Sequence, residues 1–308
     1  MDPLDKALFL ELADNCRVSF TDLSKKFDVS VNTIKNRVED MIQQGLIAFF
    51  DVQLKLSLYN ASFALVVLRL RRLLTEEERD EIGNHQFINS ISTGMQLDAL
   101  IIVIYRNNDE LNEVIEYLRA HENVLNLEVF QTLPPPSSSV NLPVSKKLDV
   151  LKKIDWMILH QLHWNGRMPI KDLAKKIGRS APTVRKRLDY MREQGLLFET
   201  VLSNIGVVGQ GFVINFGLEL PNLTIERQLE MDRVMQSTFE DSFWVSWKVA
   251  DRPIIFMTFQ VDSAAEAQDI QTRLLSMFPE YVSLTQAISG SWKYYKDFRD
   301  QILEERSR

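Results

Sequence analysis

The amino-acid sequence repeats itself with an offset of 150 residues, and this repeat limits what the chain can fold into. An offset of 150 aligns two segments of the first copy, 12–17 and 22–26, with 162–167 and 172–176 of the second without a gap. It also aligns Ser30, Thr33 and Arg37 with Ser180, Thr183 and Arg187, and Gln44–Leu46 with Gln194–Leu196. Residues 134–147 separate the copies and are rich in proline and serine, a composition that forms extended spacers rather than cores. We therefore expect two similar halves joined by a linker.

Composition excludes several classes of protein. The 308 residues are 45% hydrophobic and 25% charged, which is typical of globular domains and not of disordered or fibrous chains. A single cysteine, Cys16, excludes an internal disulfide framework and a cysteine-cluster metal site. The longest apolar runs, 61–68 and 99–105, are shorter than a membrane helix, and the N-terminus is acidic where a signal peptide would be basic. These features predict a cytoplasmic protein with no membrane partner.

Each copy opens with a pattern of three helices. The third helix carries inward-facing residues at helical spacing, namely Ile34, Val38 and Met41, repeated as Val184, Leu188 and Met191. It is preceded by a serine at the N-cap position, Ser30 or Ser180, and ended by a glycine, Gly45 or Gly195. The apolar runs 46–56 and 196–206 that follow predict a short β-hairpin, the wing. We therefore predict winged helix-turn-helix domains at 1–57 and 148–206.

The remainder of each half changes its periodicity. Residues 58–133 predict a strand, a helix, two strands, a helix and a strand, at 61–70, 75–85, 87–93, 99–105, 109–121 and 124–133. Residues 207–298 repeat this order at 212–220, 224–239, 243–249, 254–261, 263–278 and 282–292. The β-α-β-β-α-β order predicts a ferredoxin-like domain in each half. The chain is thus an α+β protein with two winged helix-turn-helix domains alternating with two ferredoxin-like domains, and residues 299–308 are a charged C-terminal tail that we expect to be a solvated helix end.

The helix-turn-helix segments resemble the Lrp/AsnC (feast/famine) family of transcriptional regulators. The resemblance rests on the third-helix residues, Leu4-Asp5, Asn15–Arg17 and Asp22-Leu23, and covers nearly the whole chain twice. It implies a winged helix-turn-helix followed by a β-α-β-β-α-β effector domain in each half, and a tandem fusion in which one polypeptide mimics the family's dimer. It also implies that chains associate further into homo-oligomers. An amino acid or related metabolite is the implied effector, with Gly94 and Asp98, or their counterpart Asp251, as the candidate binding residues.

The third helices carry the case for DNA binding, because their polar residues are of the types that reach phosphates and base edges in a major groove. The candidate residues are Arg179, Ser180, Thr183, Arg185, Lys186 and Arg187 in the second copy, and Ser30, Asn32, Thr33, Lys35, Asn36 and Arg37 in the first. Residues 155–197 contain nine basic and four acidic residues, whereas 5–47 contain six and seven, in a chain of net charge −6. We predict that the second winged helix supplies most of the affinity for double-stranded DNA.

Two other functions compete with this prediction. Siroheme decarboxylases resemble the same family, pair two such halves and use histidine and arginine near a tetrapyrrole, so an enzyme of that kind stays open. An interaction scaffold of the transcription machinery, whose net-acidic first winged helix binds protein, stays open as well. The sequence lacks phosphate-loop, Rossmann, nucleophile-elbow and metalloprotease motifs, and we expect no enzyme activity, cofactor or metal. His160 and His163 are three residues apart on a helix without a third ligand nearby, and we expect both to be partly exposed.

Overall fold

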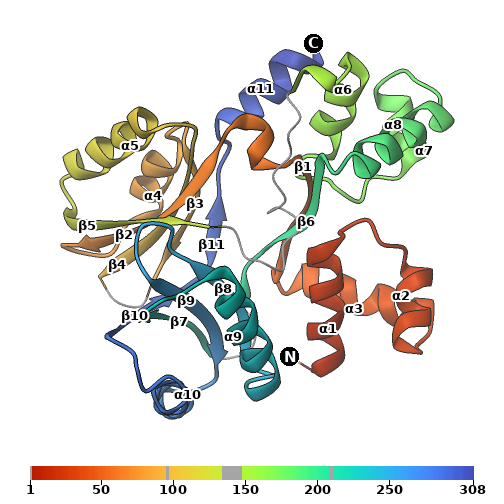
Figure 1. Ribbon diagram of the computed structural model, residues 1–308. Helices are drawn as coiled ribbons and strands as arrows, with labels where there is room; N and C mark the ends of the chain where they lie inside the picture. Colours follow the sequence, from red (N-terminus) through yellow and green to blue (C-terminus); the bar gives the residue numbers. More distant parts are fainter. Residues whose placement is uncertain (1, 95–96, 134–147, 208–210) are drawn as a thin grey trace. The chain divides into compact units, whose positions relative to one another are not determined.

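The computed structural model describes residues 2–94, 97–133, 148–207 and 211–308 (Figure 1). The predicted linker, residues 134–147, lies outside the described residues. The chain divides into two compact units: one holds both helix-turn-helix segments with the C-terminal residues 298–308, and the other holds both sheet regions. None of the described helices is long and apolar enough to cross a bilayer.

Three helices in each copy form the helix-turn-helix segments of the first unit. They are α1 (Pro3–Asp14), α2 (Phe20–Phe27) and α3 (Val31–Gln43), repeated as α6 (Lys153–Leu162), α7 (Ile170–Lys176) and α8 (Ala181–Glu193). The predicted serine caps are confirmed, because the Ser30 and Ser180 hydroxyl oxygens accept from the backbone N–H three residues later. The predicted glycine ends are confirmed too, since Gly45 and Gly195 have φ of 80° and 66°.

The two predicted wing hairpins do not form. Each run contains a single strand, β1 (Ile47–Leu54) or β6 (Leu197–Ser203), and the two strands pair with each other in antiparallel register, with Asp51 opposite Thr200 (Figure 1). Neither strand contains the glycine or asparagine that a tight hairpin turn needs, so each stays extended and finds its hydrogen-bond partner in the other copy. A two-stranded sheet therefore joins the two copies.

An arginine of each copy also donates hydrogen bonds to backbone carbonyl oxygens of the other copy. Arg17 donates to the carbonyl oxygens of Gly166 and Met168, and Arg167 donates to the carbonyl oxygen of Cys16 at 2.7 Å. These arginines occupy aligned positions in the repeat, so the exchange is reciprocal and the two copies are related by an approximate twofold axis. The first unit is an intrachain pair of helix-turn-helix segments.

The C-terminal tail is a helix with a buried face rather than a solvated end. Helix α11 (Phe298–Ser307) packs along α6, and Phe298 and Leu303 are each only 3% exposed. The Arg306 guanidinium lies 5.8 Å from the centre of the Trp156 ring. The tail prediction was wrong because charge counting did not separate the polar face of this helix from its apolar face.

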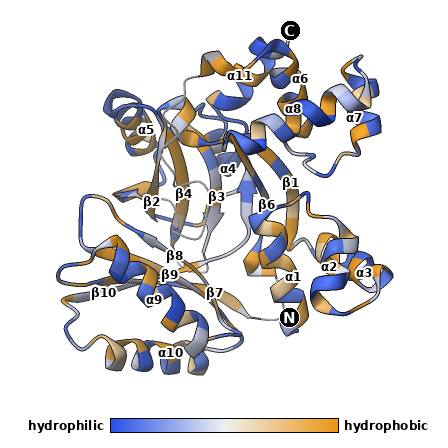
Figure 2. Cartoon of the chain, turned by 45° about the vertical axis from the view of Figure 1, so that its right-hand side comes forward, coloured by the Kyte–Doolittle hydropathy of each residue, from blue (hydrophilic) through white to orange (hydrophobic). Residues whose placement is uncertain are grey.

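Two four-stranded antiparallel arrangements form the second unit, and both confirm the predicted β-α-β-β-α-β order. The first copy contributes β2 (Ser62–Leu70), α4 (Glu76–Gly83), β3 (Ile88–Thr93), β4 (Asp98–Tyr105), α5 (Asn108–Ala120) and β5 (Val124–Thr132). The second contributes β7 (Phe212–Glu219), α9 (Ile225–Thr238), β8 (Phe243–Lys248), β9 (Ile254–Val261), α10 (Ala264–Met277) and β10 (Ser283–Ser289). The strand orders are β3-β4-β2-β5 and β10-β7-β9-β8, with apolar central strands such as β2 and β4 (Figure 2).

The last predicted strand, 282–292, is interrupted. β10 stops at Ser289, and β11 (Trp292–Tyr294) adds instead to the edge of the first copy's sheet beside β3. Gly290 permits the crossing, because a Cβ at that position would lie 2.4 Å from the Thr93 carbonyl oxygen. The second copy thus completes the first copy's sheet.

A shared core also joins the two sheets within this unit. Phe130 of the first copy packs with Val249, Ile254 and Phe256 of the second, with the Phe130 and Phe256 rings 5.0 Å apart. The backbone N–H of Leu133 donates to the Lys248 carbonyl oxygen at 2.7 Å, which links the ends of β5 and β8. The sheet domains therefore form a pseudo-dimer in one chain, as the repeat predicted.

Candidate nucleic-acid interface

The third helix of each copy presents one face to its own core and the opposite face to solvent. The inward residues are all at most 3% exposed, and they are Ile34, Val38, Met41, Val184, Leu188 and Met191. The 3.6-residue period then turns the residues between them outward. Burial of one face thus fixes which side chains each helix offers to a partner.

The second copy's helix exposes an unneutralised basic surface. Arg179, Ser180, Thr183, Arg185 and Lys186 are all exposed. Among the described residues, Arg185 and Lys186 make no ion pair or hydrogen bond through their side chains, so both cations are free to meet phosphate. Thr183 contacts the capping Ser180 hydroxyl at 2.7 Å, so these two side chains also hold the start of the helix.

Arg187 has a different role from its basic neighbours. Its Nε and Nη2 atoms donate to the two carboxylate oxygens of Asp155 at 2.7 and 2.5 Å, and Asp155 is fully buried. Its guanidinium also lies 4.4 Å from the centre of the Tyr190 ring. Arg187 therefore links α8 to α6, and its guanidinium has a structural role within the domain.

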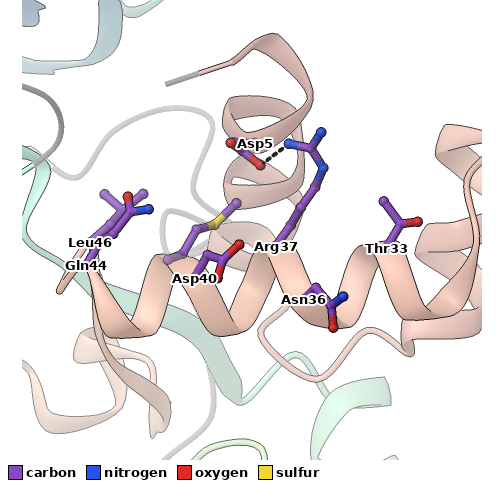
Figure 3. Close-up of a pocket in the computed structure, with 8 residues that line it drawn as sticks. Asp5, Thr33, Asn36, Arg37, Asp40, Gln44 and Leu46 are labelled. Carbon is purple, nitrogen blue, oxygen red and sulfur yellow. Dashed lines mark hydrogen bonds and ion pairs between the residues drawn. The ribbon is translucent and has the colours of Figure 1, made fainter.

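The first copy's helix exposes Ser30, Asn32, Lys35 and Asn36, while Thr33 and Arg37 are half-buried. Figure 3 shows the Arg37 guanidinium directed toward Asp5, with Asn36 on the other side of the helix. Arg37 donates to Asp5 at 2.6 Å and also to Asp2. Both carboxylates are partly exposed, so Arg37 is held by weaker partners than Arg187 is.

A groove opens beside the first copy's third helix. It has a volume of about 520 Å³, and its lining residues are Asp5, Thr33, Asn36, Arg37, Asp40, Met41, Gln44 and Leu46 (Figure 3). The repeat aligns Asp40 with Tyr190, whose ring stacks on Arg187 in the second copy. A small carboxylate thus replaces a large ring, and the two third helices have unlike surroundings.

The candidate effector residues of the first copy lie together. Gly94 follows β3 and its backbone N–H donates to the Asp98 carbonyl oxygen at 3.3 Å. A Cβ on Gly94 would lie 2.5 Å from Asp98 Oδ1 and 2.2 Å from the carbonyl oxygen of Ile288, so only glycine fits this approach of the two copies. Asp98 is 1% exposed, burial raises the pKa of its carboxyl above the ordinary value, and Arg69 lies 3.7 Å away.

Asp251, the third candidate, occupies the corresponding turn of the second copy and is not near the other two. Its carboxylate is half exposed and pairs with Arg252 at 3.6 Å. The Arg252 side chain in turn donates to the Val129 carbonyl oxygen and lies over the Phe130 ring. Arg252 therefore connects the second copy's turn to β5 of the first copy.

The histidine prediction is wrong at one of its two positions. His160 is exposed, but His163 is buried between Asp51, 2.7 Å from its Nδ1, and Asp300, 3.1 Å from its Nε2. Burial by itself would lower the pKa of His163, but the two carboxylates outweigh it and raise the pKa to about 9. His163 is thus a cation that joins β1, the end of α6 and α11. The spacing of the histidines contains no sign of these partners, because both carboxylates are more than 100 residues away in sequence.

Comparison with known proteins agrees with this geometry. The family described as winged helix-turn-helix DNA-binding matches residues 1–48 and 151–197, which are the two helix-turn-helix segments. An uncharacterised HTH-type transcriptional regulator of Pyrococcus abyssi is 24% identical over 120 residues, 38% of this chain and 80% of the relative. The HTH-type transcriptional regulator LysM of Saccharolobus solfataricus is 27% identical over 127 residues, 41% of this chain and 88% of its own.

A solved structure matches the whole chain. The siroheme decarboxylase NirDL aligns with 99% of this chain and 98% of its own, with a TM-score of 0.58 and 11% identity, which establishes likeness of fold. Each of the two relatives above aligns over most of its own length but over only about two fifths of this chain, as expected if this chain contains the relatives' unit twice. In this chain a segment that matches the winged helix-turn-helix DNA-binding family is followed by a β-α-β-β-α-β domain, and this pair of domains occurs twice.

Proposed function

We propose that this chain is a DNA-binding transcriptional regulator whose two third helices both contact the major groove of duplex DNA. The observation that carries the proposal is the intrachain pair of helix-turn-helix segments, each with an exposed polar third-helix face. The matching winged-helix family and the regulators named above support it. The ferredoxin-like pair holds the two halves together and provides surfaces through which chains associate.

The second winged helix supplies most of the affinity in this proposal. Arg185 and Lys186 are exposed and lack side-chain partners among the described residues, whereas the aligned exposed positions of the first copy hold one cation, Lys35, and the uncharged Asn36. Glu39 and Asp40 are exposed on the first helix and repel phosphate. The charge difference found in the sequence is therefore present on the exposed faces.

Salt dependence of binding tests this assignment. Fragments recovered by genome-wide occupancy are titrated with the full chain at several salt concentrations. Arg185→Ala with Lys186→Ala should flatten the plot of log affinity against log salt by up to about two units if both contact phosphate, since each lost phosphate contact contributes about 0.9, and by less if one of them reads a base edge. The matched change in the first copy, Lys35→Ala with Asn36→Ala, should flatten it by no more than about one unit. Equal losses would refute the asymmetry, and unchanged binding by both variants would refute DNA contact through these helices.

The turn that holds Gly94 and Asp98 is the proposed effector site. The ligand class is an amino acid or related metabolite, because a buried carboxylate beside Arg69 can receive an ammonium group. Thermal-shift screening of the full chain against such compounds should find a stabiliser whose effect Asp98→Ala abolishes. A stabiliser that acts equally on that variant would place the effector elsewhere.

The fold match to NirDL keeps one enzyme as a second candidate. In the first sheet domain, His85 is half-buried against Tyr117, with ring centres 4.7 Å apart, and Glu113 lies 3.5 Å from it. His121 caps the end of α5, where its Nδ1 accepts from the Asn123 backbone N–H at 3.2 Å. Both histidines thus lie at helix ends and already contact neighbouring protein groups. Mixing the protein with siroheme tests this candidate: a shifted Soret band together with a product lighter by one CO2 for each carboxyl group lost, measured by mass spectrometry, would favour the enzyme, and an unchanged spectrum with unchanged siroheme would exclude it.

A further inference from the structure

We infer that one chain reads an operator made of two unlike half-sites, so that its DNA target is not a palindrome. This inference rests on the proposed DNA-binding function and specifies the class of DNA. A homodimer presents the same side chains to both half-sites and therefore favours symmetric DNA. This chain has a twofold arrangement of its backbone but not of its exposed side chains.

The backbone arrangement fixes both third helices within one polypeptide. β1 and β6 pair over seven positions between Ile47 and Leu54, and Arg17 and Arg167 donate reciprocally across the pair. The Thr200 hydroxyl adds a bond to the Ala13 carbonyl oxygen at 2.8 Å. The two reading helices therefore keep one spacing and one relative orientation without a second chain.

The side chains at aligned exposed positions differ in what they recognise. Lys35 of the first helix aligns with Arg185, and Asn36 aligns with Lys186. Asparagine pairs with adenine through its amide, whereas arginine and lysine pair with the O6 and N7 atoms of guanine. We therefore expect an adenine at the base pair read by Asn36 in the first half-site and a guanine at the base pair read by Lys186 in the second.

The surroundings of the two helices reinforce this difference. The first helix has the acidic groove beside Asp40, and the second has the Tyr190 ring stacked on Arg187 at 4.4 Å. Arg37 can leave its partly exposed carboxylates for phosphate, whereas Arg187 is held by the buried Asp155. The residues that hold each third helix in its domain therefore differ between the copies, as the exposed residues do, and we expect the two helices to make different contacts with their half-sites.

Selection from random duplexes with the full-length chain tests the inference. The recovered consensus should contain two different half-sites, A and B, and the A–B duplex should bind at least about tenfold more tightly than the A–A duplex. Lys35→Arg with Asn36→Lys gives the first helix the exposed basic pair of the second. That variant should shift its preference from A–B toward B–B, while Lys25→Arg, an exposed change on α2, should leave the preference unchanged.

The outcomes separate this inference from the function on which it rests. A palindromic consensus, or equal binding of A–B, A–A and B–B duplexes, would overturn the inference and leave DNA binding intact. Failure to select any duplex would overturn the proposed function and the inference with it. Native mass spectrometry at saturating A–B duplex should show equal numbers of chains and duplexes in each complex, and a ratio of two chains to one duplex would also count against a single-chain reader.

Discussion

Replacing Arg187 by alanine should destabilise the second winged helix far more than replacing its counterpart Arg37 destabilises the first. Arg187 donates two hydrogen bonds to Asp155, which is fully buried, and the substitution leaves that carboxylate without its cation. Breaking a buried ion pair in this way costs about 3–5 kcal/mol. Arg37→Ala leaves Asp2 and Asp5, whose side chains are 47% and 25% exposed, and should cost about 1 kcal/mol or less.

Native-state hydrogen exchange is the suitable measurement, because a chain with two units need not unfold in one step. Amides of α6 and α8 should exchange roughly a hundredfold faster or more in Arg187→Ala, and amides of α1 and α3 no more than about fivefold faster in Arg37→Ala. Adding Asp155→Asn to Arg187→Ala removes the buried charge and should restore much of the protection. Equal acceleration in the two copies, or no rescue by Asp155→Asn, would refute the reasoning.

Two further predictions concern pH and packing. The folded-state pKa of His163 is raised to about 9, so its charge stabilises the first unit fully below about pH 6.5, and this contribution is lost as the pH rises through about 9. The Tm of the first unit should therefore fall between these pH values, and His163→Gln should make the Tm depend less on pH. Gly83→Ala should destabilise the second unit by roughly 1–3 kcal/mol, because the new Cβ would lie 2.2 Å from the Tyr295 ring. Since alanine by itself favours helices over glycine, a raised Tm would contradict the contact between α4 and Tyr295.

The sequence by itself determined the elements that depend on local chemistry. The duplicated halves, the serine caps, the glycine ends and the inward face of each third helix all follow from residues within a few positions of one another. The order of elements in the ferredoxin-like domains follows from the same kind of local periodicity. The charge difference between the two third helices could also be counted directly, because exposed positions of a helix are set by its period.

Only the tertiary structure decided which distant groups meet. A sequence that predicts a strand does not contain the identity of its partner, so β1 and β6 were predicted as separate hairpins although they pair with each other. The same reason applies to β11 on the first copy's sheet and to α11 on α6. Arg187 and its neighbour Lys186 look equivalent in sequence, yet Asp155 lies 32 positions away and binds only the first of them. Local hydrogen bonds define the elements of this protein, whereas burial and pairing across its two copies decide which arginines hold the fold together and which are left for a partner.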